Sequence, residues 1–244
     1  MANIFKKAEI LFKAGIKRKK YDNIIPLGYN CEIAYRFYRH FRFIESSLFA
    51  WVYINSFEEL LNALKNPDLL AQGELVYENT MFKCLNSGIY FHGKTSAEKF
   101  TGDTETIHKL IASDIEELRP RIEYLSDKLV KTVNNGKSTL FIKKISQKEA
   151  CEAGMYNKIL ELYTFLEKFS KNQFDLLLIT ENSFYNDFLY NEPNIYTRSV
   201  EKYSPDSAVT NKKAGDKFGW DVIFTEFAPK KRVWKKKKLK FEEI

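Results

Sequence analysis

The chain has 244 residues, of which 44% are hydrophobic and 15% aromatic, so it can bury a sizeable core and is not a disordered segment. Three cysteines without a CxxC pair argue against a disulfide framework and against a zinc site. With no apolar run of membrane-spanning length and no recognisable signal peptide, we expect a cytoplasmic protein that needs no metal and no cofactor.

The net charge of +7 is distributed unevenly. Residues 1–20 and residues 230–244 each carry +6, which leaves −5 on residues 21–229. We therefore expect a basic amphipathic helix over 1–20, a single α/β domain over 21–229 and a basic tail over 230–244. Basic ends that contain aromatic residues suit an anionic membrane surface, such as the inner membrane, better than nucleic acid. Solvated charged extensions are the alternative for both ends.

The stretch 24–34 predicts a short apolar strand, a tight turn and the start of a helix. Gly28 and Asn30 lie in the turn, where residues that tolerate unusual backbone angles are favoured. Cys31 falls at the first residue of the helix, where free N–H groups and the helix dipole favour a thiolate. This placement predicts a nucleophile, with a packing cysteine as the alternative.

Trp51 precedes a helix that is predicted to begin after Ser56, which has Glu59 three residues on, as in a capping box. Trp51 is expected either to wall a pocket or to pack in the core. The next region, residues 65–106, is the least regular and contains a short predicted strand over 89–91.

The strand over 89–91 ends at His92, one of only three histidines in the chain. His40 lies nine residues along the helix from Cys31, about 13 Å away and out of reach. His108 falls in a polar helical stretch. His92 is therefore the predicted partner of Cys31, and an ordinary histidine at a strand end is the alternative.

Strands and helices alternate in the second half of the chain. The expected elements are a helix over 104–133, a strand over 138–142, a helix over 155–169, and strands over 174–180, 195–197 and 221–224. This order predicts an α/β fold, a Rossmann-like three-layer sandwich with a mainly parallel sheet. Ligands bind beyond the carboxyl ends of such strands, so Cys31, Lys143–Lys144 and Glu181–Asn182 are expected to converge on one cleft.

The segment Leu27-Gly28-Tyr29-Asn30-Cys31, which continues to Phe49-Ala50-Trp51, resembles a bacterial family of unknown function described as papain-like cysteine peptidases. The family pattern also has a strand ending in His-Asp, a helix with paired arginines and a Phe-Val-Arg-like strand. These would match Phe91-His92, Arg119-Pro120-Arg121-Ile122 and Phe141-Ile142-Lys143. The resemblance is strongest over residues 24–64. Ala50 and Gly93 stand where the family pattern has Asp.

The resemblance and the placement of Cys31 together predict a hydrolase or acyl transferase. Cys31 would attack a carbonyl group, and His92 would act first as base and then as acid. Gly28, Asn30, Trp51 and Lys143 are the predicted substrate-binding residues, for a small-molecule, glycan or peptide substrate. Two alternatives stay open: an SGNH-like esterase or acyltransferase with Cys31 in the serine position, and a non-nucleophilic sugar- or nucleotide-binding protein of surface-polysaccharide assembly.

Overall fold

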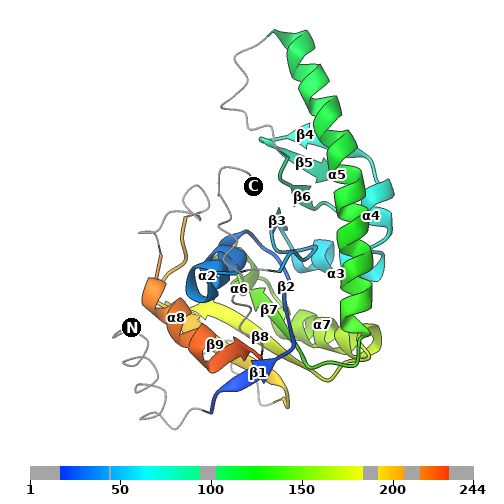
Figure 1. Ribbon diagram of the computed structural model, residues 1–244. Helices are drawn as coiled ribbons and strands as arrows, with labels where there is room; N and C mark the ends of the chain where they lie inside the picture. Colours follow the sequence, from blue (N-terminus) through cyan, green and yellow to red (C-terminus); the bar gives the residue numbers. More distant parts are fainter. Residues whose placement is uncertain (1–16, 44, 94–102, 184–191, 206–214, 231–244) are drawn as a thin grey trace.

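The computed structural model describes residues 17–43, 45–93, 103–183, 192–205 and 215–230 (Figure 1). Most of the predicted N-terminal helix and nearly all of the predicted basic tail lie outside these residues, so membrane binding by the two ends stays a prediction. In the part of the chain that is described, no helix combines the length and the apolar character needed to cross a bilayer.

One of the two main sheets has four strands, all parallel. Its strands are β2 (Asn23–Pro26), β7 (Thr139–Lys144), β8 (Phe174–Glu181) and β9 (Ile195–Val200), in the order β2-β7-β8-β9. Side chains alternate between the two faces of a strand, so Leu140 and Ile142 enter one apolar cluster and Phe141 enters the other. The continuous apolar runs of β7 and β8 reflect burial on both faces.

Helices cover both faces of this sheet (Figure 1). On one face lie α2 (Glu32–Phe41) and α8 (Lys217–Glu226), and on the other lie α5 (Thr104–Val133) and α7 (Met155–Phe169). The helices α5 and α7 have the predicted bounds, which confirms their apolar periodicity as the signal. The α/β class with parallel strands is also confirmed.

The second main sheet also has four strands, and they are antiparallel. Its strands are β3 (Val52–Tyr53), β6 (Tyr90–Phe91), β5 (Met81–Cys84) and β4 (Leu75–Glu78), in the order β3-β6-β5-β4. The short helices α3 (Phe57–Lys65) and α4 (Leu69–Gln72) accompany it. The long helix α5 runs beside both sheets (Figure 1), and one apolar cluster joins Phe82 and Phe91 to Phe141 and Leu176.

Two sequence predictions need correction, and one element was missed. The strand predicted over 221–224 lies inside α8, because Trp220, Ile223 and Phe224 share a buried helical face and Asp216 caps the helix. The predicted helix over 1–20 does not reach its end, since β1 (Lys19–Tyr21) pairs in parallel with β10 (Phe227–Pro229). The β4–β5 hairpin within residues 65–106 was not predicted. Helix α6 (Gln147–Ala150) completes the described elements.

The turn between β2 and α2 requires glycine at position 28. Gly28 has a φ of +76°, and the next residue, Tyr29, also has a positive φ of 83°. A Cβ atom on Gly28 would lie 2.5 Å from Cδ1 of Ile54, whose N–H donates to the carbonyl of Tyr29. Both the backbone conformation and the nearby side chain of Ile54 therefore disfavour a side chain at position 28.

We expect Gly28→Ala to lower the free energy of unfolding by about 3 kcal/mol, through left-handed strain plus overpacking. Gly136→Ala is the matched control, because Gly136 has a φ of +74° and no atom lies within 4 Å of the position that the added methyl group would take. It should cost about 1 kcal/mol, from backbone strain alone. Urea unfolding measures both variants, and equal losses would show that Ile54 does not restrict the turn.

Candidate active site

Cys31 and His92 come into contact although they belong to different sheets. Cys31 is the N-cap residue of α2, directly after the turn that follows β2, and His92 directly follows β6. The Cys31 sulfur lies 3.3 Å from Nε2 of His92. His40 lies elsewhere and contacts Asp221 of α8 through Nδ1 at 2.8 Å. The structure thus brings together the two residues that were predicted as a pair.

The start of α2 is held by Asn30. Its side-chain oxygen accepts a hydrogen bond from the N–H of Glu32, the first helical residue, at 3.0 Å, whereas the side chain of Cys31 makes no capping bond. The side chain of Asn30 is buried, so it stabilises the helix start that carries Cys31 from inside the protein. The N–H of Glu32 is thereby occupied, and any oxyanion stabilisation at this helix start has to come from other donors.

A buried carboxylate ties α2 to the end of β7. Glu32 is fully buried, and its Oε2 accepts a hydrogen bond from the Lys144 ammonium at 2.8 Å. Its Oε1 accepts from Arg36 at 3.3 Å and from the backbone N–H of Ser204 at 3.0 Å. Lys144 also reaches the side-chain oxygen of Asn30 at 3.4 Å. These bonds compensate the desolvation of the charges and fix the residue next to Cys31.

Lys143 is buried and paired inside the protein. Its ammonium is fully buried and donates to Oε1 of Glu149 at 2.8 Å, while Oε2 of Glu149 accepts from Ser146. Glu181 accepts from the N–H of Tyr203 at 2.7 Å, and Asn182 is exposed. Lys143 and Glu181, at the ends of β7 and β8, therefore bind groups of the protein itself. This arrangement does not support the predicted substrate-binding role of Lys143 or the predicted shared cleft.

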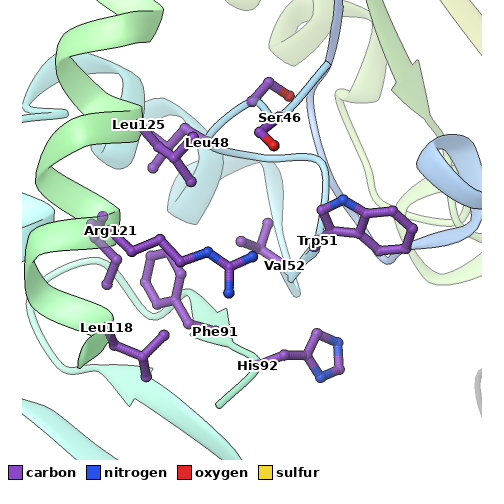
Figure 2. Close-up of a pocket in the computed structure, with 11 residues that line it drawn as sticks. Ser46, Leu48, Trp51, Val52, Phe91, His92, Leu118, Arg121 and Leu125 are labelled. Carbon is purple, nitrogen blue, oxygen red and sulfur yellow. The ribbon is translucent and has the colours of Figure 1, made fainter. Parts of the chain in front are cut away.

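A small hollow of about 30 Å³ lies beside His92, between the antiparallel sheet and α5. Figure 2 shows the half-buried Trp51 on one side of it and the side chain of Arg121 pointing into it from α5. Ser47 and Phe91 also line it. Trp51 thus walls a hollow, as predicted. Gly28 and Asn30 do not line it, and they act by shaping the turn.

The surroundings of His92 favour its neutral form. The His92 side chain is exposed on one side, and the protein atoms around the rest of the imidazole remove part of its hydration, which lowers its pKa below the ordinary value of 6.5. The positive charge of Arg121 lowers this pKa further. Among the described residues, none forms a hydrogen bond with Nδ1 of His92. At neutral pH the ring is therefore an uncharged group that can accept the proton of the Cys31 thiol.

The two positions where the family pattern has Asp leave no room for a third catalytic group. Ala50 is buried in the core. A Cβ atom on Gly93 would collide with the ring of Phe82 and would lie 2.7 Å from Oδ2 of Asp114, a buried residue of α5. Packing thus explains why position 93 is a glycine, and Asp114 occupies the space next to it.

Two residues of the site had no clear signal in the sequence. Glu32 follows Cys31 in a helical pattern in which its burial was not evident. Arg121 entered only through the resemblance, although its place beside the apolar stripe of Leu118, Ile122 and Leu125 puts it at the edge of the buried face of α5.

Comparisons with known proteins find no counterpart of this chain. No family model matches it, no curated protein matches its sequence and no solved structure matches its fold. The resemblance to papain-like cysteine peptidases therefore stays an expectation, and the chemistry has to be argued from the site.

We expect Glu32→Gln to lower the free energy of unfolding by about 3 kcal/mol, because it removes the carboxylate that lies 2.8 Å from the buried ammonium of Lys144. Urea denaturation measures this loss. Glu105→Gln is the control, since Glu105 pairs with Lys109 on the exposed surface of α5 and the pair contributes little. An unchanged urea midpoint for Glu32→Gln would show that the cluster does not hold α2.

His92 should titrate below pH 6.5 in a Cys31→Ser variant, which removes the thiol's own titration. Adding Arg121→Gln should raise this midpoint, because a neighbouring positive charge disfavours the imidazolium. Adding Lys131→Gln, the same charge change on the exposed side of α5, should leave it unchanged. NMR of the imidazole protons measures the titration midpoint of all three variants. An equal midpoint with and without Arg121→Gln would show that the charge of Arg121 does not lower the pKa of His92.

Proposed function

We propose that this protein is a cysteine-dependent hydrolase or acyl transferase, with Cys31 as nucleophile and His92 as general base. The observation that carries the proposal is the 3.3 Å contact between Sγ and Nε2 at the start of a ten-residue helix. A thiol at a helix start, next to a neutral imidazole, is the arrangement that activates a cysteine at neutral pH.

In the first step the sulfur of Cys31 attacks the carbonyl carbon of the substrate while its proton moves to Nε2 of His92. The tetrahedral intermediate then expels the leaving group, which takes the proton from the imidazolium, and a thioester remains on Cys31. Water, or a second substrate, attacks the thioester with His92 again as base, and the thiol is restored. Hydrolysis releases a carboxylic acid, and transfer releases a new ester, thioester or amide.

The Rossmann-like assignment is part of the same proposal. The parallel order β2-β7-β8-β9 and the helices on both faces favour it. The nucleophile follows the first strand of that sheet, at its carboxyl end, where ligands of such folds bind. The antiparallel sheet that supplies His92 is an addition to this plan.

The alternatives receive less support from the site. In an SGNH-like enzyme the histidine follows the sheet strands in the chain, whereas His92 precedes β7. In a binding protein without nucleophilic chemistry, the cysteine has no need of a histidine at 3.3 Å. The hollow beside His92 is nevertheless compatible with ligand binding, so the test has to separate binding from covalent chemistry.

Incubation with an N-acetylcysteamine thioester or p-nitrophenyl acetate should place an acyl group on Cys31, which intact-protein and peptide mass spectrometry detects. We expect His92→Asn to slow acylation at pH 7 by about a hundredfold or more, because the general base is lost. Cys31→Ser should abolish it.

Cys151→Ser is the matched control, because Cys151 is an exposed thiol remote from any histidine contact that the structure records. It should leave acylation of Cys31 unchanged. Acylation of Cys151 and Cys31 at equal rates would show that the helix start does not activate the thiol, and the binding function would take precedence.

A further inference from the structure

Arg121 differs from the other arginine and lysine residues of α5, because each of those has a partner among the described residues and Arg121 has none. Arg119, two residues before it, donates to the carbonyl oxygens of Ala71 and Gly73 at 2.6 and 2.9 Å. Lys128 pairs with Glu45 at the helix surface. Within the described ranges, no carboxylate or carbonyl group accepts a hydrogen bond from Arg121. Its guanidinium points into the hollow beside His92 (Figure 2).

A second polar group without a partner lies in the wall of the same hollow, where a rotation of its side chain would present it to a ligand. The hydroxyl oxygen of Ser47 is buried and has no hydrogen-bond partner among the described residues. A buried hydroxyl that stays unpaired costs free energy, so native proteins usually satisfy such a group. A ligand that accepts a hydrogen bond from Ser47 would satisfy it.

The described residues that line the hollow carry charge of one sign. No acidic side chain is among them, and Arg121 supplies a permanent positive charge. The imidazole of His92 connects this hollow to the sulfur of Cys31, since it lines the hollow and contacts the thiol through Nε2. A group held by Arg121 is therefore placed next to the reacting atoms.

We propose that the substrate of Cys31 carries an anionic oxygen group, a carboxylate or a phosphate, which Arg121 and Ser47 bind in this hollow. The planar guanidinium presents parallel N–H donors that match the two oxygens of such a group. The hollow of about 30 Å³ admits only the end of the group, so the remainder of the substrate lies over the open side at His92. This inference rests on the proposed function and names the substrate class of the same site.

The test compares two alkylating reagents that differ in charge. Iodoacetate and iodoacetamide both form a bond between the thiolate sulfur and their methylene carbon, with loss of iodide, and only iodoacetate is an anion. The ratio of their rates at Cys31 cancels the reactivity of the thiolate itself. Cys151 provides the reference ratio in the same molecule, because it is exposed. Peptide mass spectrometry measures both sites.

We expect the iodoacetate-to-iodoacetamide ratio to be about tenfold higher at Cys31 than at Cys151 at low salt, because a positive charge close to the thiolate attracts the anionic reagent. Arg121→Gln should remove this preference, and Lys131→Gln should keep it. Arg121→Lys should restore part of it, since it keeps the charge without the two parallel donors. Circular dichroism of each variant confirms the fold.

Protection of Cys31 from alkylation distinguishes a phosphate group from a carboxylate group on the substrate. Inorganic phosphate and acetate are each added at millimolar concentrations and constant ionic strength, and the rate of Cys31 alkylation by iodoacetamide is followed. Protection by phosphate identifies a phosphate-bearing substrate, and protection by acetate a carboxylate-bearing one. In either case Arg121→Gln should abolish the protection.

The outcomes that overturn the inference are distinct from those that overturn the proposed function. A Cys31 that reacts rapidly with iodoacetamide but shows the charge ratio of Cys151, with no protection by either anion, refutes the anion site and leaves the nucleophile intact. A folded protein in which Cys31 reacts no faster than Cys151 with iodoacetamide, and accepts no acyl group, refutes the nucleophile and the substrate class with it.

Discussion

The carboxylate of Glu32 is the group on which the rest of the site depends. It is buried at the first turn of α2 and receives donors from Lys144, from Arg36 and from the backbone of Ser204. These partners come from the end of β7, from the helix itself and from the segment after β9. A single charged group thus connects three parts of the chain at the point where Cys31 begins its helix. Burying a carboxylate is tolerated only with such complete pairing, so the position of α2 is specified narrowly.

The sequence predicts best the elements whose apolar pattern is long. The helices α5 and α7 repeat their buried residues over several turns, and β8 is a continuous apolar run, so each signal is strong. Strands β3 and β6 have only two residues each, too few for any period to appear. The run Val222-Ile223-Phe224 has the composition of a strand, but its helical pattern depends on Trp220 and on the face of the sheet that it covers.

The site is divided in the same way. Cys31 could be predicted because strand, turn and helix start are adjacent in the chain, and His92 because the chain has few histidines. The ion pairs of Lys143 and Lys144 could not be predicted, because the acids come from separate elements. Glu149 lies on α6 and Glu32 on α2. Two lysines at a strand end have the same local sequence whether they face a ligand or a buried carboxylate.

Gly93 shows how packing can limit chemistry. The ring of Phe82 and the carboxylate of Asp114 fill the space beside it, so an acid at this position would require both to move. The histidine next to it is placed instead by the strand that precedes it and by its contact with Cys31. A pair without an orienting acid depends on rigid surroundings to keep the imidazole in place.

The origin of Cys31 and His92 in two different sheets gives the pair a further property. Cys31 comes after a strand of the parallel sheet, and His92 comes after a strand of the antiparallel sheet. Side chains of one apolar cluster join the two sheets, and α5 lies beside both. A hydrogen-bonding contact of 3.3 Å is lost when the two sheets move apart by about 1 Å. The reactivity of the Cys31 thiol therefore depends on the spacing of the two sheets. Substitutions in their common core can change this reactivity although the substituted residues contact neither Cys31 nor the substrate.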